Sequence, residues 1–191
     1  MTQLAPDHQW GGSMLERTQE EWDVLTSEWQ QAQAGLADRV IEHLAGLDQE
    51  KSVFPLTRLG HSLQVATRAA RANRDDEYVF CALVHDIGDT LAIYNHADLG
   101  AAVVKPFVRP AYHWMVQKHD VFQGYFFWHF VGRDRNAREE YRGHPNFDLT
   151  AEFCEDYDQV SFDVNYANMP LEEFRPLVRD VMSRPWAHKN A

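Results

Sequence analysis

The stretch LVHDIGD, residues 83–89, joins a histidine and an aspartate directly to the end of an apolar run, residues 77–84. The run predicts a short buried helix. Neighbouring side chains on an α-helix point about 100° apart, so His85 and Asp86 can both face one site only where the helix ends or around a central cavity. Gly88 favours such an end. An aspartate placed there can bridge two metal ions while the histidine binds one of them.

Four further residues of metal-ligand type lie on other predicted helices. They are His61 on residues 59–72, His96 on residues 96–104, His119 on residues 111–131 and Asp158 on residues 148–160. Imidazole and carboxylate groups suit divalent iron, manganese or zinc. We expect His61 and Asp158 to complete the ligands of a first metal ion. His96 and His119 would hold a second ion, with positions left open for water, oxygen or substrate. Asp163 is the alternative to Asp158 as the last ligand.

The remaining pattern is helical. Thr18 and Glu21 form a capping box, and the apolar residues that follow at steps of three, four and seven predict an amphipathic helix to about Leu47. The strict alternation that is typical of strands is absent. We therefore expect an all-α fold, with a flexible N-terminal arm over residues 1–13 and a single helical domain over residues 14–191.

The C-terminal third is expected to contain a segment on the surface of the bundle and a last helix that packs on the bundle. Residues 133–147 are charged and contain Gly143 and Pro145, which predicts a surface excursion. Pro170 then opens a last helix over residues 171–182.

Composition limits the kinds of partner. The formal net charge is -11, and the 18 Lys and Arg are scattered rather than gathered in a basic stripe, so we expect neither nucleic acid nor a membrane as partner. The N-terminus carries no secretory signal, and Cys81 and Cys154 cannot make a disulfide framework. A cytoplasmic protein that acts on a small molecule is expected, while the oligomeric state is not indicated.

The ligand pattern resembles a known superfamily. His61, His85-Asp86 and Asp158 match the H…HD…D signature of HD-domain proteins, and the two extra histidines are similar to its dinuclear members. The segments LGHSLQVATRAA, ALVHDIGD, NHADLGAAVV and QKHDVFQGYFF, followed by Tyr157-Asp158, resemble the ligand motifs of the mixed-valent diiron oxygenases. That group is typified by myo-inositol oxygenase and 2-amino-1-hydroxyethylphosphonate oxygenase.

The resemblance implies a helical HD-domain bundle, two iron ions as Fe(II)/Fe(III), and O2 as co-substrate. It also implies cleavage of a C–P or C–C bond next to a hydroxyl-bearing carbon in a small polar substrate, such as an organophosphonate or a polyol. Asp86 and Asp89 are then the candidate catalytic residues. The candidate substrate-binding residues are Arg58, Asp89, Gln123 and Lys118.

Three positions depart from the pattern of the phosphonate-cleaving members. Asp89 replaces a histidine, Gln123 replaces a lysine and Glu155 replaces an arginine. Each change removes positive charge from the place where a phosphonate would be held, unless Arg58, Arg68 or Lys118 compensates.

Other readings of the same residues stay open. Several aromatic residues form either a core stripe or a wall for a quaternary ammonium group: Tyr94, Trp114, Tyr125, Phe126 and Trp128. We interpret His113, His129 and His144 as structural or surface residues. The main alternative to an oxygenase is a metal-dependent HD phosphohydrolase acting on a nucleotide or small phosphoester, although few basic residues lie near the motifs. A regulatory HD domain without activity is the third reading, but no ligand is lost here.

Overall fold

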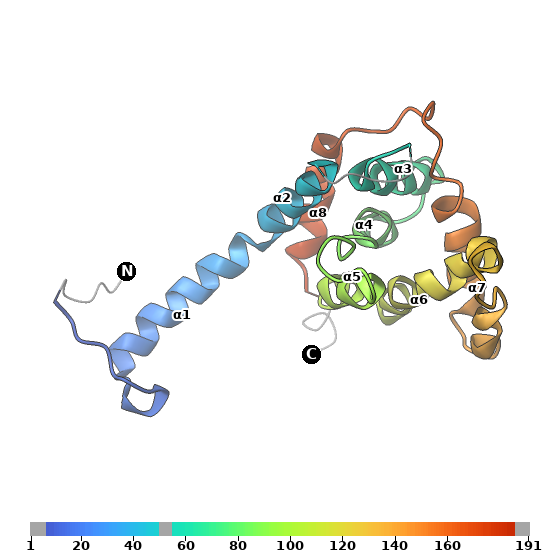
Figure 1. Ribbon diagram of the computed structural model, residues 1–191. Helices are drawn as coiled ribbons and strands as arrows, with labels where there is room; N and C mark the ends of the chain where they lie inside the picture. The colour runs from blue at the N-terminus through green and yellow to red at the C-terminus, as the bar shows by residue number, and fades with distance from the viewer. Residues whose placement is uncertain (1–6, 50–54, 186–191) are drawn as a thin grey trace. The chain divides into compact units, whose positions relative to one another are not determined.

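The computed structural model describes residues 7–49 and 55–185, and within them it contains eight α-helices, short 3-10 helices, one π-helix and no strand. This confirms the expected all-α class. The chain divides into two compact units, residues 1–39 and residues 40–191, and each is described by itself. The α-helices are α1 Gln19–Ala34, α2 Leu36–Gly46, α3 Arg58–Arg71, α4 Asp76–Val84, α5 His96–Val104, α6 Pro110–Phe127, α7 Phe147–Glu152 and α8 Leu171–Met182 (Figure 1). The division into an arm and a single domain at residue 13 stays a prediction.

Helix α1 begins where the capping box places it. The Thr18 hydroxyl accepts the backbone N–H of Glu21, and the Glu21 carboxylate accepts the N–H of Thr18. The prediction of one helix from there to about Leu47 is wrong, because the helix ends at Ala34 and α2 begins at Leu36. Gly35 separates the two, and glycine is a poor helix former.

Helix α4 is the centre of the second unit. Each of its residues from Tyr78 to Val84 is buried, as expected of a helix that is covered on all sides. Helices α3, α5, α6 and α8 all pack against α4, and Figure 1 shows α4 between α3 and the pair formed by α5 and α6. The His-Asp pair that follows Val84 therefore enters the middle of the bundle.

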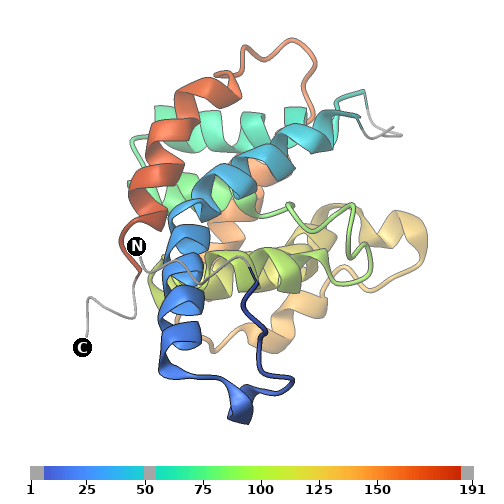
Figure 2. The same cartoon turned by 90° about the vertical axis from the view of Figure 1, so that its left-hand side faces the viewer.

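A long connection lies along α3. The Gln64 amide donates to the backbone carbonyl of Asp163, and the backbone N–H of Met169 donates to the Thr67 hydroxyl. Figure 2 shows the segment over residues 159–170 reaching α8 along this path. These contacts hold the connection against the buried middle of α3.

The last ligand segment is helical, as predicted for residues 148–160. Its helix begins as α7, Phe147–Glu152, and continues directly as a π-helix, η5, over Phe153–Asp158. The predicted surface excursion over residues 133–147 contains the 3-10 helix η4, Ala137–Tyr141, which has no buried residue. The last helix, α8, has the predicted bounds.

None of the helices in the described ranges is both long enough and apolar enough to span a membrane.

Helix α5 packs so closely on the end of α4 that a single methyl group would disturb it. A Cβ added at Gly100 would overlap with the backbone carbonyl oxygen of His85, whereas a Cβ at Gly46 would meet no atom within 4 Å. Both glycines lie in helices, where alanine is intrinsically favoured by about 1 kcal/mol. The close approach at Gly100 should outweigh that preference.

We expect Gly100→Ala to lower the free energy of unfolding by about 1–3 kcal/mol, because backbone must move to admit the methyl group. Gly46→Ala is the matched control and should be neutral or stabilising. Urea denaturation followed by circular dichroism measures both. A Gly100→Ala protein as stable as Gly46→Ala would contradict this description of the α4–α5 contact.

Candidate metal centre

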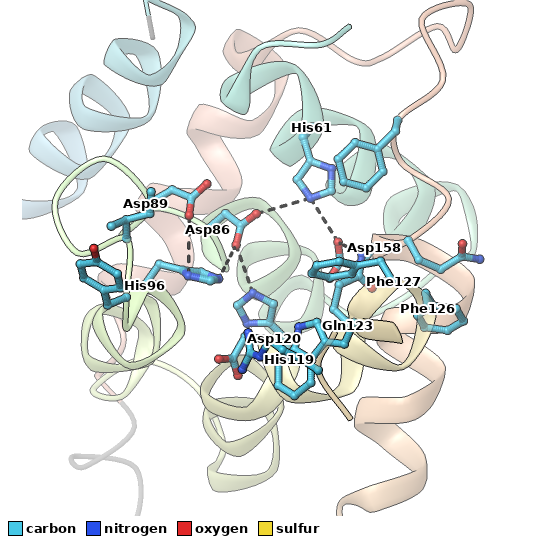
Figure 3. A pocket seen from close by; sticks show the side chains of 16 residues that line it. His61, Asp86, Asp89, His96, His119, Asp120, Gln123, Phe126, Phe127 and Asp158 are labelled. Atoms are coloured by element: carbon cyan, nitrogen blue, oxygen red, sulfur yellow. Dashed lines mark hydrogen bonds and ion pairs between the residues drawn. The ribbon is translucent and has the colours of Figure 1, made fainter. Parts of the chain in front are cut away.

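Five elements bring six side chains to one place in the second unit. They are His61 from α3, His85 and Asp86 after α4, His96 at the start of α5, His119 from α6 and Asp158 at the end of η5. Figure 3 labels all of them except His85. His61, His85, His119 and Asp158 are buried, while Asp86 and His96 are half-buried. The six residues proposed from the sequence therefore meet, although they span almost one hundred positions.

Asp86 lies between two pairs of histidines. Its Oδ2 atom is 3.5 Å from His61 Nε2 and 3.3 Å from His85 Nε2. Its Oδ1 atom is 3.5 Å from His96 Nε2 and 3.1 Å from His119 Nε2. Each carboxylate oxygen thus faces its own pair of nitrogens, as a carboxylate that bridges two metal ions must.

Asp158 adds a fourth donor to the first group. Its Oδ1 atom is 3.2 Å from His61 Nε2 and 3.9 Å from His85 Nε2, and these two nitrogens are 3.3 Å apart. Ligands held about 2.1 Å from one ion lie about 3.0–3.4 Å apart at octahedral to tetrahedral angles. The spacing therefore fits donors around a single ion.

The second group is supported by a further carboxylate. The Nδ1 atom of His96 is 3.7 Å from Asp89 Oδ1, and Asp89 forms an ion pair with Arg58. Carboxylates in this position orient metal-binding imidazoles and raise their basicity. The structure thus places Asp89 and Arg58 behind His96, where they position it.

The orientation of the buried histidines indicates that a proton or a metal ion binds between them. The Nδ1 atoms of His61, His85 and His119 face the carbonyl oxygens of Ser161, Ala82 and Val116 at 3.0, 2.9 and 2.7 Å. A carbonyl can only accept, so each Nδ1 carries the hydrogen and each neutral ring turns the lone pair of Nε2 inward. Lone pairs of two nitrogens that face each other, as those of His61 and His85 do, need a proton or a metal ion between them.

A buried oxygen of Asp158 points to the same conclusion. Its Oδ2 atom has no hydrogen-bond partner among the described residues. An unpaired buried carboxylate oxygen is costly unless a cation is near. Asp163, the alternative ligand, is exposed, and its Oδ1 accepts the backbone N–H of Asn165. The structure therefore brings Asp158, not Asp163, into the cluster.

Without a metal, protons would take the place of the cations. Burial disfavours protonation of His119, but its hydrogen bond to Asp86 and the negative charges of Asp86 and Asp158 outweigh this and raise its pKa to about 9. Burial is likewise outweighed at His61, whose pKa is raised by Asp158 and Asp86. Burial would raise the pKa of Asp86, but the surrounding histidines hold it well below its usual range.

A cavity of about 600 Å³ opens beside the cluster. His61, Asp86, His96, His119 and Asp158 line it on one side. The rest of the wall is largely apolar and aromatic: Ile93, Tyr94, Phe126, Phe127, Trp128 and Phe162. A second, smaller cavity of about 90 Å³ lies between Arg58, Asp89 and the first ligand group.

Only some of the predicted substrate-binding residues line a cavity. Gln123 lines the large cavity and donates to Asp158 Oδ1 at 3.3 Å. Asp89 lines both cavities, and Arg58 lines only the small one. Lys118 lines neither cavity, and its Nζ lies 5.4 Å from the ring centre of Tyr141. Their roles toward a substrate stay predictions.

Only some of the aromatic candidates line the large cavity, and the extra histidines do not. Tyr94, Phe126 and Trp128 line the cavity, whereas Trp114 stacks on His144 with ring centres 4.0 Å apart. The remaining candidates, Tyr125, His113 and His129, are also absent from its wall.

Sequence reasoning missed six residues of the cavity wall, which are Ile93, Asp120, Phe127, Arg133, Gln159 and Phe162. Phe162 stacks on His61 with ring centres 4.5 Å apart, and Arg133 lines the cavity. Phe162 follows the last ligand segment directly, which could have drawn attention to it. Arg133 lies in the charged segment that was predicted to be a surface excursion, and no local pattern distinguishes it from the other charged residues there.

A comparison with protein-family models finds that residues 58–162 match the HD domain family. The match covers just over half of the 191 residues and includes all six side chains of the cluster. No curated protein matches the chain. The chain therefore belongs to the HD-domain family, which implies a metal-dependent hydrolase or a related activity.

Three overlapping groups within the cluster could hold a metal ion. They are His61, His85 and Asp86; His85, His119 and Asp158; and Asp86, His96 and His119. The donors are four imidazoles and two carboxylates, a set that suits iron, zinc or manganese better than calcium or magnesium.

Asp158→Ala should remove a ligand from the first group, and Asp163→Ala is its matched control. We expect the Asp158→Ala protein to bind metal at least tenfold more weakly, and Asp163→Ala to bind it like the wild type, because only Asp158 faces the histidines. Inductively coupled plasma mass spectrometry after dialysis measures the metal retained. Loss of metal from Asp163→Ala alone would reverse the choice of ligand.

Metal binding should release a proton at neutral pH, because the pKa of His119, raised to about 9 by Asp86 and Asp158, leaves this imidazole protonated in the metal-free protein. We expect the apparent metal affinity to rise from pH 6.5 towards pH 9. Titration calorimetry in buffers of different ionisation enthalpy counts the protons released.

The stability of the metal-free protein should change in the opposite direction. Protonated His119 favours the folded state, since its folded pKa of about 9 exceeds the unfolded value of about 6.5. This contribution is complete below about pH 6.5 and disappears as the pH rises through about 9. Thermal unfolding in chelator should therefore give a falling Tm over this range, and a flat or rising Tm would contradict the assignment.

Proposed function

We propose that the protein is a diiron oxygenase that uses O2 to oxidise and cleave a C–P or C–C bond next to a hydroxyl-bearing carbon. The observation that carries the proposal is the position of Asp86 between two pairs of histidines. It supports a site for two ions that share one carboxylate.

The composition of the second group favours iron. It consists of His96, His119 and one oxygen of Asp86, and all three residues line the large cavity. Two histidines and one carboxylate with open positions are the ligand set of non-haem iron oxygenases. The first group has the additional donor Asp158, which leaves fewer positions free there. In this proposal the substrate and O2 approach from the cavity side.

The walls of the cavity place aromatic side chains beside the metal ligands. Its lining includes Phe126, Trp128 and Phe162, which give an organic substrate an apolar surface to pack against. Two iron ions, when bound, would supply the activation of O2 and the acidification of a substrate hydroxyl. The residues of the chain would then have three tasks: Asp86 would supply a carboxylate oxygen to each ligand group, Asp89 would orient His96, and Gln123 would keep Asp158 in place by donating to Oδ1.

The proposed reaction balances without another reductant. For a 1-hydroxyalkylphosphonate, the carbon that bears the hydroxyl becomes a carboxylate and phosphate is released. The substrate gives up four electrons, O2 accepts them, and both oxygen atoms enter the products.

The rival function is the hydrolysis of a phosphoester, which membership of the HD-domain family keeps open. A phosphohydrolase usually holds its anionic substrate with several basic side chains. Among the described residues that line the large cavity, Arg133 is the only arginine or lysine, and Arg58 at the small cavity is paired with Asp89. This charge distribution favours the oxygenase.

The proposal is tested by anaerobic reconstitution with Fe(II) followed by partial oxidation. We expect two iron ions per chain and the EPR signal of a spin-coupled, mixed-valent pair. His96→Ala should retain the first ion but lose this signal, because it removes a ligand of the second group only. Hydrolysis of nucleotides with Mn²⁺, together with a single bound iron and no pair signal, would establish the rival function instead.

A further inference from the structure

Arg133 forms an unusual part of the cavity wall. Gly132 adopts the left-handed conformation, with φ 76°, and the backbone N–H of Arg133 donates to the carbonyl of Trp128 at 2.9 Å. This turn returns the side chain onto the indole, so that the guanidinium carbon lies 3.5 Å from the ring centre of Trp128. Trp128 is itself buried, with 6% of its surface exposed. The guanidinium is therefore held against a fixed surface.

The charge of Arg133 is available for a ligand. Arg58, the other arginine near the cluster, pairs with Asp89, whereas no carboxylate of the described residues lies within ion-pair distance of Arg133. A planar guanidinium that is held in place and lacks a carboxylate partner suits two-point binding of a carboxylate or a phosphonate.

Arg133 and the carboxylates reach the cavity from different elements. Asp120, whose Oδ1 accepts the N–H of Val121, lines the cavity next to His119 on α6. Trp128 follows α6 in the 3-10 helix Trp128–Val131, and its indole packs against Gly124 on one side and carries Arg133. The guanidinium thus stands at the Trp128 end of a wall whose other charged side chains are carboxylates and histidines.

The same contact makes a cationic substrate unfavourable at this end. Tryptophan offers the best aromatic face for a cation, and Arg133 already covers that of Trp128. Tyr125 is likewise covered by Arg135 and Arg138, at 4.3 and 3.5 Å. A quaternary ammonium group would meet a positive charge here rather than a free aromatic face.

We propose that Arg133, stacked on Trp128, binds an anionic group of the substrate. The substrate is then a hydroxy compound that also carries a carboxylate or a phosphonate. This inference rests on the proposed function only in taking the large cavity as the substrate site.

The test uses the zinc-loaded protein, which has no oxygen chemistry, and three small hydroxyl compounds of similar length. They are 4-hydroxybutyrate, butane-1,4-diol and choline, which end in an anion, a neutral group and a cation. We expect calorimetry to show 4-hydroxybutyrate binding on the order of tenfold more tightly than butane-1,4-diol, and choline most weakly.

Two variants connect this preference to Arg133. Arg133→Gln should remove most of the tenfold preference, and Arg133→Lys should retain part of it, because a lysine keeps the charge but not the planar fork. Arg135→Gln is the matched control, since Arg135 lies on an aromatic ring but does not line the cavity. Its preference should equal that of the wild type.

Tighter binding of choline than of 4-hydroxybutyrate, or an unchanged preference in Arg133→Gln, would overturn the inference. The outcome is independent of the proposed oxygenase activity. If the iron-loaded protein lacked the paired-iron signal but the zinc-loaded protein kept an Arg133-dependent anion preference, the oxygenase would be rejected and the anion site upheld.

Discussion

A half-buried carboxylate between two pairs of imidazoles is the constraint on which the rest of the structure depends. Asp86 can keep its charge there only because positive charge, from protons or metal ions, stands on both sides of it. The surrounding helices have to supply the nitrogens from different directions. This explains why α4 is enclosed on all sides and why α5 packs so closely on its end at Gly100.

The two sides of the carboxylate face different surroundings. The first group has Asp158 and Phe162 around it, and His61 is stacked on the phenyl ring. The second group has fewer donors and has Asp89 behind His96, while residues of both groups line the large cavity. The first group therefore offers more protein ligands than the second. This asymmetry supports a site in which one ion would have a structural role and the other would bind the substrate.

Most of the helices and the six clustered side chains could be predicted because each has a local cause. Capping residues such as Thr18 mark helix ends, and the ligand candidates are histidines and aspartates that match the motifs of a known superfamily. The break at Gly35 escaped prediction because the apolar spacing continues across it. The π-helix over Phe153–Asp158 adds only one residue to a turn, which leaves no mark on so short a pattern. The position of the Arg133 side chain depends on the turn at Gly132 and on the ring of Trp128, five residues earlier, so it could not be predicted from the local sequence.

The hydrogen bonds that orient the imidazoles differ in how far away in the sequence the acceptor carbonyl lies. His85 and His119 each bond to a carbonyl three residues earlier in the chain, so their orientation is set locally as their own helices form. His61 bonds to Ser161, one hundred residues away, and its orientation therefore depends on the connection along α3. Two imidazoles are thus oriented by their own helices, whereas the third is oriented by a contact between distant parts of the chain. Ser161 also donates its backbone N–H to the carbonyl of Asp158. A shift of that one connection would therefore disturb both ligands that belong to the first group alone, His61 and Asp158, while the two locally fixed imidazoles keep their orientation.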